Sequence, residues 1–258
     1  MSRDVTDRPI IFSAPMIRAL LEGRKTQTRR MLKCRKGVTL ADFEQGEPHA
    51  SGIGNWMRLD REKIQEPRFK AGDRLWVREN WRVGAWDEDD GCIAVDYCDG
   101  PRREWLEIPD DYDGEKFNRL WISTCDELSA KGIDTDKDGK YHWKPGASPC
   151  RWRPSIHMPR WASRLTLIVE GVKIERLQEI SEADAVAEGI RETEAPAKDG
   201  MRHFGIDGPG GLPTARLAFF ELWTAINGAE SYRANPWVAA ISFRVVKANI
   251  DVMKKEVP

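Results

Sequence analysis

Apolar positions recur with two periods along this chain, and the two periods predict a sheet accompanied by a few helices. Helical spacing of apolar residues marks three segments, at 14–23, 181–190 and 214–228. Alternating or short apolar runs mark strands, at 8–13, 75–78, 92–97, 160–180 and 235–246, the fourth of these being either two strands or one long bent strand. The order lacks the regular strand–helix alternation of a doubly wound sheet. We therefore expect an α+β fold, with a small mixed β-barrel, flanking helices and long loop insertions.

Start and stop signals support two of these helices. The first has Pro15 in its first turn and Gly23 as its terminator. The second follows Ser181, a favourable N-cap, with acidic Asp184 three positions later and Gly189 at its end. These signals place the ends of both helices within a residue or two.

Stretches rich in Gly, Pro and Asp interrupt the periodic segments. They lie at about 34–66, 84–150 and 191–213, where patterning is weak. We expect a single domain over 8–248 that carries these three insertions, followed by a tail over 249–258.

Composition and charge exclude some classes of protein. Hydrophobic residues make up 40% and charged residues 32% of the 258 positions, as in a folded chain rather than a disordered one. The formal net charge is −1, from 41 basic and 42 acidic residues, so the basic field that drives non-specific DNA binding is absent. Any affinity for nucleic acid must come from a local patch.

The chain has neither an apolar run of membrane-spanning length nor the apolar core of a signal peptide at its start. Its five cysteines are odd in number and form no C-x-x-C pair. Free thiols are typical of a reducing compartment. We expect a cytoplasmic protein.

No metal site or cofactor site is expected. The stretch DTDKDG at 134–139 imitates half of a calcium loop, but Pro145 stands where the bidentate glutamate belongs. His142, Cys150 and His157 match no common zinc spacing. The glycine pattern of a phosphate-binding loop and the G-x-S-x-G elbow of a serine hydrolase are also missing.

The segment CRWRPSIHMPRWASR at 150–164 interleaves four arginines with two tryptophans and a histidine. Such residues stack on bases and pair with phosphates, so a nucleic-acid contact is one interpretation. The alternative is a proline-rich connector whose tryptophans fill the core, and the sequence favours neither.

The segment GRKTQTRR at 23–30 brings basic residues and two threonines together directly after a helix. An exposed lysine is too basic to accept protons at neutral pH, but burial lowers its pKa. A lysine with a threonine hydroxyl and one carboxylate would form a compact nucleophile, base and acid without a metal.

With Gly23, Lys25, Thr28 and Arg30 in this order, the segment resembles the signature of ASCH domains, a branch of the PUA-like superfamily. Further stretches follow in family order: GDRLWV, LTLIVEGVKIERLQEIS, EADAVAEGI, FFELWTAI and PWVAAISF. The resemblance covers about half the chain and extends to the longer ASCH-related proteins of phages and prophages. It implies a PUA-like mixed β-barrel with helices covering its openings.

The resemblance also implies a site and an activity. Some small bacterial ASCH proteins are N4-acetylcytidine amidohydrolases that use a lysine, a threonine and a glutamate, which correspond here to Lys25, Thr28 and Glu188. Lys25 would act as base, Thr28 as nucleophile or water-positioner, and Glu188 would shuttle a proton or orient the lysine. Further residues are expected to contact the ligand: Arg24, Thr26, Arg29, Arg30, His157, Arg160 and Trp161. Of these, Arg24 and Arg29 are expected to face outward.

Two other functions remain open under the same resemblance. The fold also serves as an RNA-, DNA- or modified-base-binding module, and fold does not determine function. Other ASCH proteins are linked to ribonuclease activity. In each case we expect the partner to be a modified nucleoside or single-stranded nucleic acid, and no membrane.

Overall fold

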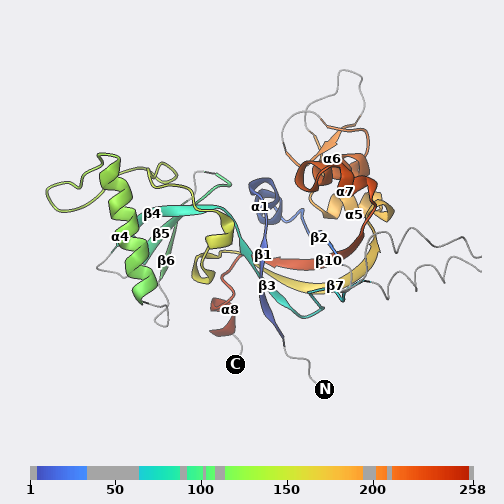
Figure 1. The fold of residues 1–258 in the computed structure, drawn as a ribbon, viewed down its shortest axis with the longest axis horizontal. Coiled ribbons are helices and arrows are strands. Elements are labelled where there is room, and N and C mark those ends of the chain that lie inside the picture. Colours follow the sequence, from blue (N-terminus) through green and yellow to red (C-terminus); the bar gives the residue numbers. More distant parts are fainter. Residues whose placement is uncertain are drawn as a thin grey trace, which may run out of the picture. The chain divides into compact units, whose positions relative to one another are not determined.

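The structure is a computed structural model. It describes residues 5–33, 64–87, 92–100, 103–107, 114–193, 202–207 and 211–255. Its strands are β1 (Asp7–Ile11), β2 (Gln27–Met31), β3 (Arg74–Arg78), β4 (Trp81–Asp87), β5 (Cys92–Tyr97), β6 (Arg103–Glu107), β7 (Thr166–Arg176), β8 (Arg191–Glu192), β9 (Phe204–Gly205) and β10 (Trp237–Val246). Its α-helices are α1 (Ala14–Leu21), α4 (Gly114–Ala130), α5 (Glu182–Ala187), α6 (Ala215–Asn227), α7 (Ala229–Arg233) and α8 (Val252–Lys255) (Figure 1).

The strands form three sheets. The largest has the strand order β1-β3-β7-β10-β2, the second is β4-β5-β6, and the third is the pair β8-β9. The large sheet mixes a parallel pair, β1 with β3, and an antiparallel pair, β2 with β10. The α+β class is therefore confirmed, but the described strands leave every sheet open and close no barrel.

Contacts along the chain cluster into two compact units. The first unit comprises Met1–Leu21, Arg74–Leu167 and Val245–Pro258, and the second comprises Glu22–Asp73 and Ile168–Arg244. Strands β7 and β10 each contribute residues to both units.

The first unit contains more regular structure than the single strand, at 92–97, that was expected within the insertion at about 84–150. Strands β4, β5 and β6 form an antiparallel meander, and α4 lies against this sheet (Figure 1). Trp86 explains the contact, because its ring centroid lies 5.4 Å from that of Phe117 and 4.6 Å from that of Trp121, both on α4. Scattered aromatic residues in a Gly- and Asp-rich stretch thus pack a core that hydrophobic periodicity alone does not reveal.

In the second unit, α5, α6 and α7 lie together beside the end of β7 (Figure 1). The α5 cap matches the sequence signal, since the backbone N–H of Asp184 donates to Ser181 Oγ at 3.0 Å. Thr214 caps α6 in the same way, and its Oγ1 accepts from the backbone N–H of Leu217 at 3.2 Å. The helices bury an apolar cluster, built around Leu177, Ala185, Phe219, Trp223 and Val238.

Strand β2 was not among the strands expected from the sequence. It pairs antiparallel with β10, with Gln27 opposite Ser242 and Met31 opposite Val238. Sequence reasoning missed it because a buried strand normally carries apolar residues, and QTRRM has one. Its buried cation, Arg29, pairs with Glu175 and Glu188, which lie far away in the sequence.

None of the helices within the described ranges combines the length and the apolar run that a membrane crossing requires.

Candidate active site

Backbone pairing brings Lys25 beside Glu188 in the second unit. Gly23 has a φ of 76°, a conformation that glycine adopts without strain, and the chain turns there before it reaches Lys25. Lys25 then forms an isolated antiparallel bridge with Glu188, which caps the C-terminal end of α5. The N–H of Thr26 donates to the carbonyl of Ala187 at 2.8 Å, which fixes this segment against α5.

The side chains of Lys25 and Glu188 meet inside the protein. Lys25 Nζ donates to Glu188 Oε2 at 2.7 Å and to the Glu188 carbonyl at 2.8 Å. The two side chains are 0% and 3% exposed. Burial lowers the pKa of Lys25, because it disfavours the charged ammonium, while the Glu188 carboxylate opposes this effect.

Arg29 is the second cation on Glu188. Its Nη1 donates to Glu188 Oε1 at 3.1 Å, and its Nε and Nη2 donate to Glu175 Oε1 at 3.0 and 2.6 Å. The Arg29 side chain is 1% exposed, so the expectation that it faces outward is wrong. Glu175 from β7 explains the burial, since a buried guanidinium needs carboxylate partners.

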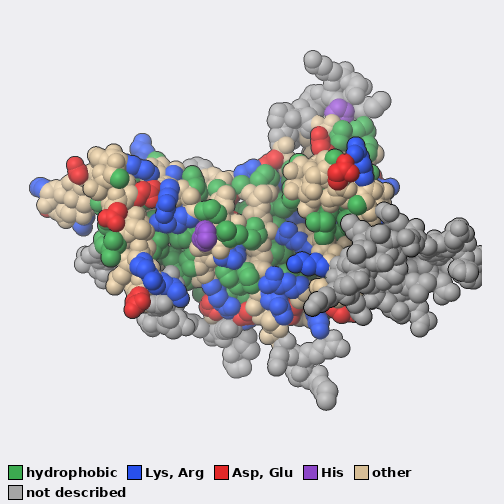
Figure 2. All heavy atoms as spheres, in the orientation of Figure 1, with side chains coloured by type: hydrophobic (Ala, Val, Ile, Leu, Met, Phe, Trp, Pro, Cys, Tyr) green, Lys and Arg blue, Asp and Glu red, His purple; other side chains and the backbone are tan. Residues whose placement is uncertain are grey.

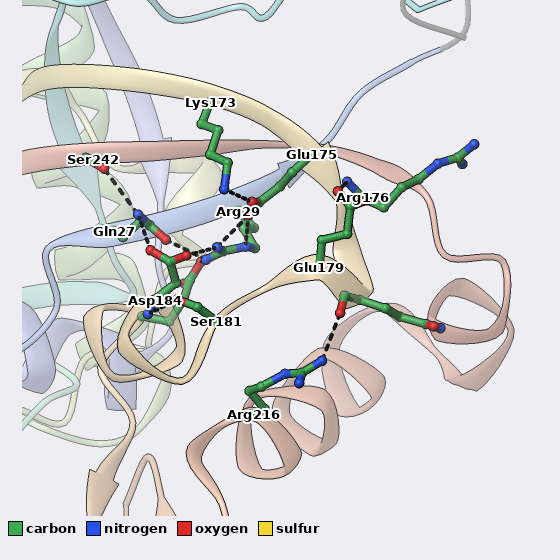
Figure 3. Close-up of polar contacts among 12 residues, drawn as sticks. Gln27, Arg29, Lys173, Glu175, Arg176, Glu179, Ser181, Asp184, Arg216 and Ser242 are labelled. Atoms are coloured by element: carbon green, nitrogen blue, oxygen red, sulfur yellow. Dashed lines mark hydrogen bonds and ion pairs between the residues drawn. The ribbon is translucent and has the colours of Figure 1, made fainter. Parts of the chain in front are cut away.

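Three polar side chains lie around the Arg29 guanidinium, those of Gln27, Glu175 and Asp184 (Figure 3). Gln27 Oε1 accepts from Arg29 Nη1 at 2.6 Å, while Gln27 Nε2 donates to Asp184 Oδ1 and Ser242 Oγ, both at 3.2 Å. Asp184 Oδ2 lies 3.5 Å from Arg29 Nη2. Sequence reasoning missed Gln27 and Glu175. The alternation of Gln27 and Arg29 on one strand was the available signal for the first, and no local pattern marked the second.

Thr28 is buried on β2 opposite Ile241 of β10. Successive side chains of a strand point to opposite faces, and Gln27 and Arg29 both point toward Asp184 (Figure 3). The Thr28 side chain therefore leaves β2 on the other face from these two residues. The structure brings Lys25 and Glu188 together. The Thr28 side chain lies on the opposite face of β2 and is not part of this cluster.

The remaining predicted ligand residues of this segment differ in exposure. Arg24 is 16% exposed and donates to the carbonyls of Gly189 and Ile206, so it is committed to the protein backbone instead of facing outward. Thr26 is exposed. Arg30 is partly buried. Burial lowers its pKa, and the charge of Glu188 opposes this effect only in part.

The other three predicted ligand residues lie in the first unit. Trp161 is 6% exposed and packs edge-on against Trp81, with ring centroids 6.2 Å apart, so it presents no free face for a base. Arg160 bonds Asp7 and Asp251 at 2.7–2.8 Å, and these hydrogen bonds raise its pKa. His157 is exposed. For Trp161 and Arg160, the packing interpretation fits the structure.

Among the described residues, no group of three or more His, Cys, Asp or Glu side chains is arranged to hold a metal ion. In the calcium-like stretch, the Asp136 carboxylate accepts from the backbone N–H groups of Asp138 and Lys140, both at 2.9 Å. These bonds are those of an aspartate-stabilised turn.

Comparison of the chain with protein-family models, with curated proteins and with solved structures finds no match.

Proposed function

We propose that this protein is an ASCH-type amidohydrolase that removes the acyl group from N4-acylated cytidine, on a PUA-like fold. The observation that carries the proposal is the buried contact between Lys25 Nζ and Glu188 Oε2 at 2.7 Å. Both residues occupy the positions that the ASCH resemblance assigns to catalysis, and they are 163 positions apart in the sequence.

The pair has the chemistry that metal-free amide hydrolysis needs. Burial lowers the pKa of Lys25, which makes its neutral amine more available as a base. In the proposed reaction Lys25 takes a proton from water or from the Thr28 hydroxyl, and the oxygen attacks the acyl carbon. The bond to N4 breaks, the nitrogen receives the proton, and cytidine and the carboxylic acid are released. When Thr28 attacks, water then cleaves the acyl-threonine ester.

Access is a requirement of this proposal, because Lys25 is 0% exposed in the structure. Thr28 is 3% exposed, and its side chain lies on the face of β2 opposite to Gln27 and Arg29. It can attack directly only if β2 rearranges to bring its hydroxyl to Lys25. Water is the nucleophile that the observed geometry favours.

The first test is turnover of N4-acetylcytidine, followed by ultraviolet absorbance, for the wild type and for Lys25→Met, Glu188→Gln and Thr28→Val. We expect losses of at least about a hundredfold for the Lys25 and Glu188 variants, which is the range of general acid–base catalysis. Retained activity in Thr28→Val would identify water as nucleophile. Turnover that survives Lys25→Met would contradict the proposal.

A second candidate function is recognition of single-stranded nucleic acid, and specific contacts in the first unit favour it. Trp152 is 44% exposed, and the Arg82 guanidinium lies 4.4 Å from the centroid of its ring. The Arg78 guanidinium lies 5.1 Å from the ring of Trp76 on β3. Figure 2 shows Lys and Arg side chains among hydrophobic ones over β1 and β3. An exposed tryptophan near partly buried arginines can stack on an unpaired base and bring cations to its phosphate.

Fluorescence titration with a single-stranded RNA tests this candidate. We expect Trp152→Ala to weaken binding by about tenfold, the lower part of the range for one stacked base. Trp105→Ala is the matched control, since Trp105 is 52% exposed on β6. Equal weakening by the two variants would indicate non-specific contact.

A further inference from the structure

Five side chains of the second unit alternate in charge from the interior to the surface. They are called the charge row and run in the order Lys25, Glu188, Arg29, Glu175 and Lys173. Successive members are joined by contacts of 2.7, 3.1, 2.6 and 2.6 Å. The first four side chains are at most 3% exposed, and Lys173 is 68% exposed.

Arg29 divides the two oxygens of Glu188 between two cations. Arg29 Nη1 contacts Oε1, and Lys25 Nζ contacts Oε2. Because each oxygen has its own cationic donor, rotation of the carboxylate would break both contacts. The side chain of Glu188 is thereby fixed with one oxygen directed at the lysine amine.

Arg29 is itself held in place. Gln27 and Glu175 accept three hydrogen bonds from its guanidinium, at 2.6, 3.0 and 2.6 Å. The guanidinium carbon also lies 5.7 Å from the centroid of the Phe219 ring on α6. An arginine with so many partners in one orientation acts as a rigid support.

We propose that Arg29 is a positioning residue for the Lys25–Glu188 pair, and that it holds the Glu188 carboxylate oriented toward the Lys25 amine. Arg29 is not one of the residues that the ASCH signature marks. The assignment rests on the proposed function in so far as it concerns catalysis, but its electrostatic part is independent of any substrate.

Charge gives the proposal a measurable consequence. Burial lowers the pKa of Lys25, and the charges of Arg30 and Arg29 lower it further, so removal of Arg29 should raise the pH at which the Lys25 ammonium loses its proton. In Arg29→Gln we expect the acidic limb of the pH–rate profile to move upward by about one unit or more, the usual effect of one charge at such distances. Arg29→Lys keeps the charge and should restore most of the wild-type profile.

The matched control is Lys173→Gln, which removes the same charge from the outer end of the charge row. Lys173 contacts Glu175 Oε2 at 2.6 Å and is largely solvated. Solvent screens its charge, so we expect its pH–rate profile to move by less than half as much.

A second measurement needs no turnover. Selective ¹³C and ¹⁵N labelling of lysine side chains lets NMR follow the titration of Lys25 in the full chain. Lys25 should titrate at higher pH in Arg29→Gln than in the wild type, and close to the wild-type value in Arg29→Lys. If Arg29→Gln does not fold, Arg29→Gln combined with Glu175→Gln removes one charge of each sign and keeps the interior balanced.

The outcomes separate the two proposals. A Lys25 titration that is the same in Arg29→Gln and in the wild type would overturn the role of Arg29. A shifted titration without turnover of any N4-acylcytidine by the wild type would support the electrostatic role and reject the amidohydrolase. Equal pH shifts in Arg29→Gln and Lys173→Gln would show a general charge effect and overturn the positioning role.

Discussion

Lys25 and Glu188 show how burial changes what an ionisable side chain does. An ammonium and a carboxylate in water interact weakly, but these two are almost without exposed surface and lie 2.7 Å apart. Each depends on the other, because an isolated buried charge costs several kcal/mol. The same dependence underlies both the proposed catalysis and the stability of this part of the fold.

Glu188→Gln tests the stability side of this pair. The variant leaves the cations Lys25 and Arg29 facing a neutral amide, so we expect the free energy of unfolding at pH 7 to fall by about 3 to 5 kcal/mol. Urea denaturation measures the change. Glu192→Gln is the control, since Glu192 and its partner Arg202 are exposed, and it should change stability by less than about 0.5 kcal/mol. Similar losses of unfolding free energy in the two variants would mean that burial does not strengthen the Lys25–Glu188 ion pair.

Glu79 in the first unit predicts a pH dependence of stability. It is 1% exposed and pairs with Arg164 at 2.8 Å. Burial, helped by the charges of Asp99 and Glu104 and opposed by Arg164, raises its pKa from 4.5 to about 7. The folded protein therefore binds this proton more tightly than the unfolded chain does.

Because the folded state binds this proton more tightly, Glu79 makes the folded state less stable as the pH rises. The contribution of Glu79 to the free energy of unfolding is fully present below pH 4.5. It is lost as the pH rises to about 7, and the total loss is about 3 kcal/mol. Glu79→Gln should remove this slope from denaturation curves recorded between pH 4.5 and 7. Glu107→Gln on β6 should keep it. A slope that persists in Glu79→Gln would assign it to another group.

At the scale of elements, α5 is a helix of six residues that carries Glu188 at its C-terminal end. So short a helix has little stability of its own and depends on its cap and its packing. Ser181 caps it at 3.0 Å, as Thr214 caps α6 at 3.2 Å. The two caps are alike, but only α5 holds a member of the candidate site.

Ser181→Ala and Thr214→Ala form a matched pair of variants. Each should lower the free energy of unfolding by about 1 kcal/mol, the usual value of a lost N-cap. Only Ser181→Ala should also change turnover or the Lys25 titration, because Glu188 moves with α5. Thermal denaturation together with the lysine NMR signal measures both effects. If the two variants shift the Lys25 titration equally, α5 does not position Glu188.

At the scale of the whole molecule, the described residues form two units with separate aromatic cores. Trp81 is 2% exposed in the core of the first unit, and Trp223 is 5% exposed in that of the second. Local stability follows local packing, so each core should govern the opening of its own unit.

Hydrogen exchange followed by mass spectrometry tests this expectation. Trp81→Leu should speed exchange mainly in β4, β5 and α4, and Trp223→Leu mainly in α5, α6 and β2. Each loss of a large buried ring should cost about 3 kcal/mol or more. If either variant accelerates exchange evenly throughout the chain, the two units unfold as one.

Several elements were predictable because their signals are local. The α5 helix follows from its cap and apolar spacing, α6 follows from apolar spacing alone, and β10 follows from the run WVAAISF. Sequence reasoning failed for α4 and for β2. The first carries only two buried residues, so its apolar stripe is weak, and the second is a polar strand whose charges find partners elsewhere.

By itself, the sequence determined the α+β class, the positions of most of the regular elements and the identity of Lys25 and Glu188 as a candidate pair, because caps, periodicity and motifs act over a few residues. Only the tertiary structure decided which side chains neutralise one another. It buried Arg29, placed Glu175 against it, directed Thr28 to the other face of β2 and packed Trp161 into a core. Charge pairing and burial join residues that are distant in the chain, and no local pattern encodes those distances.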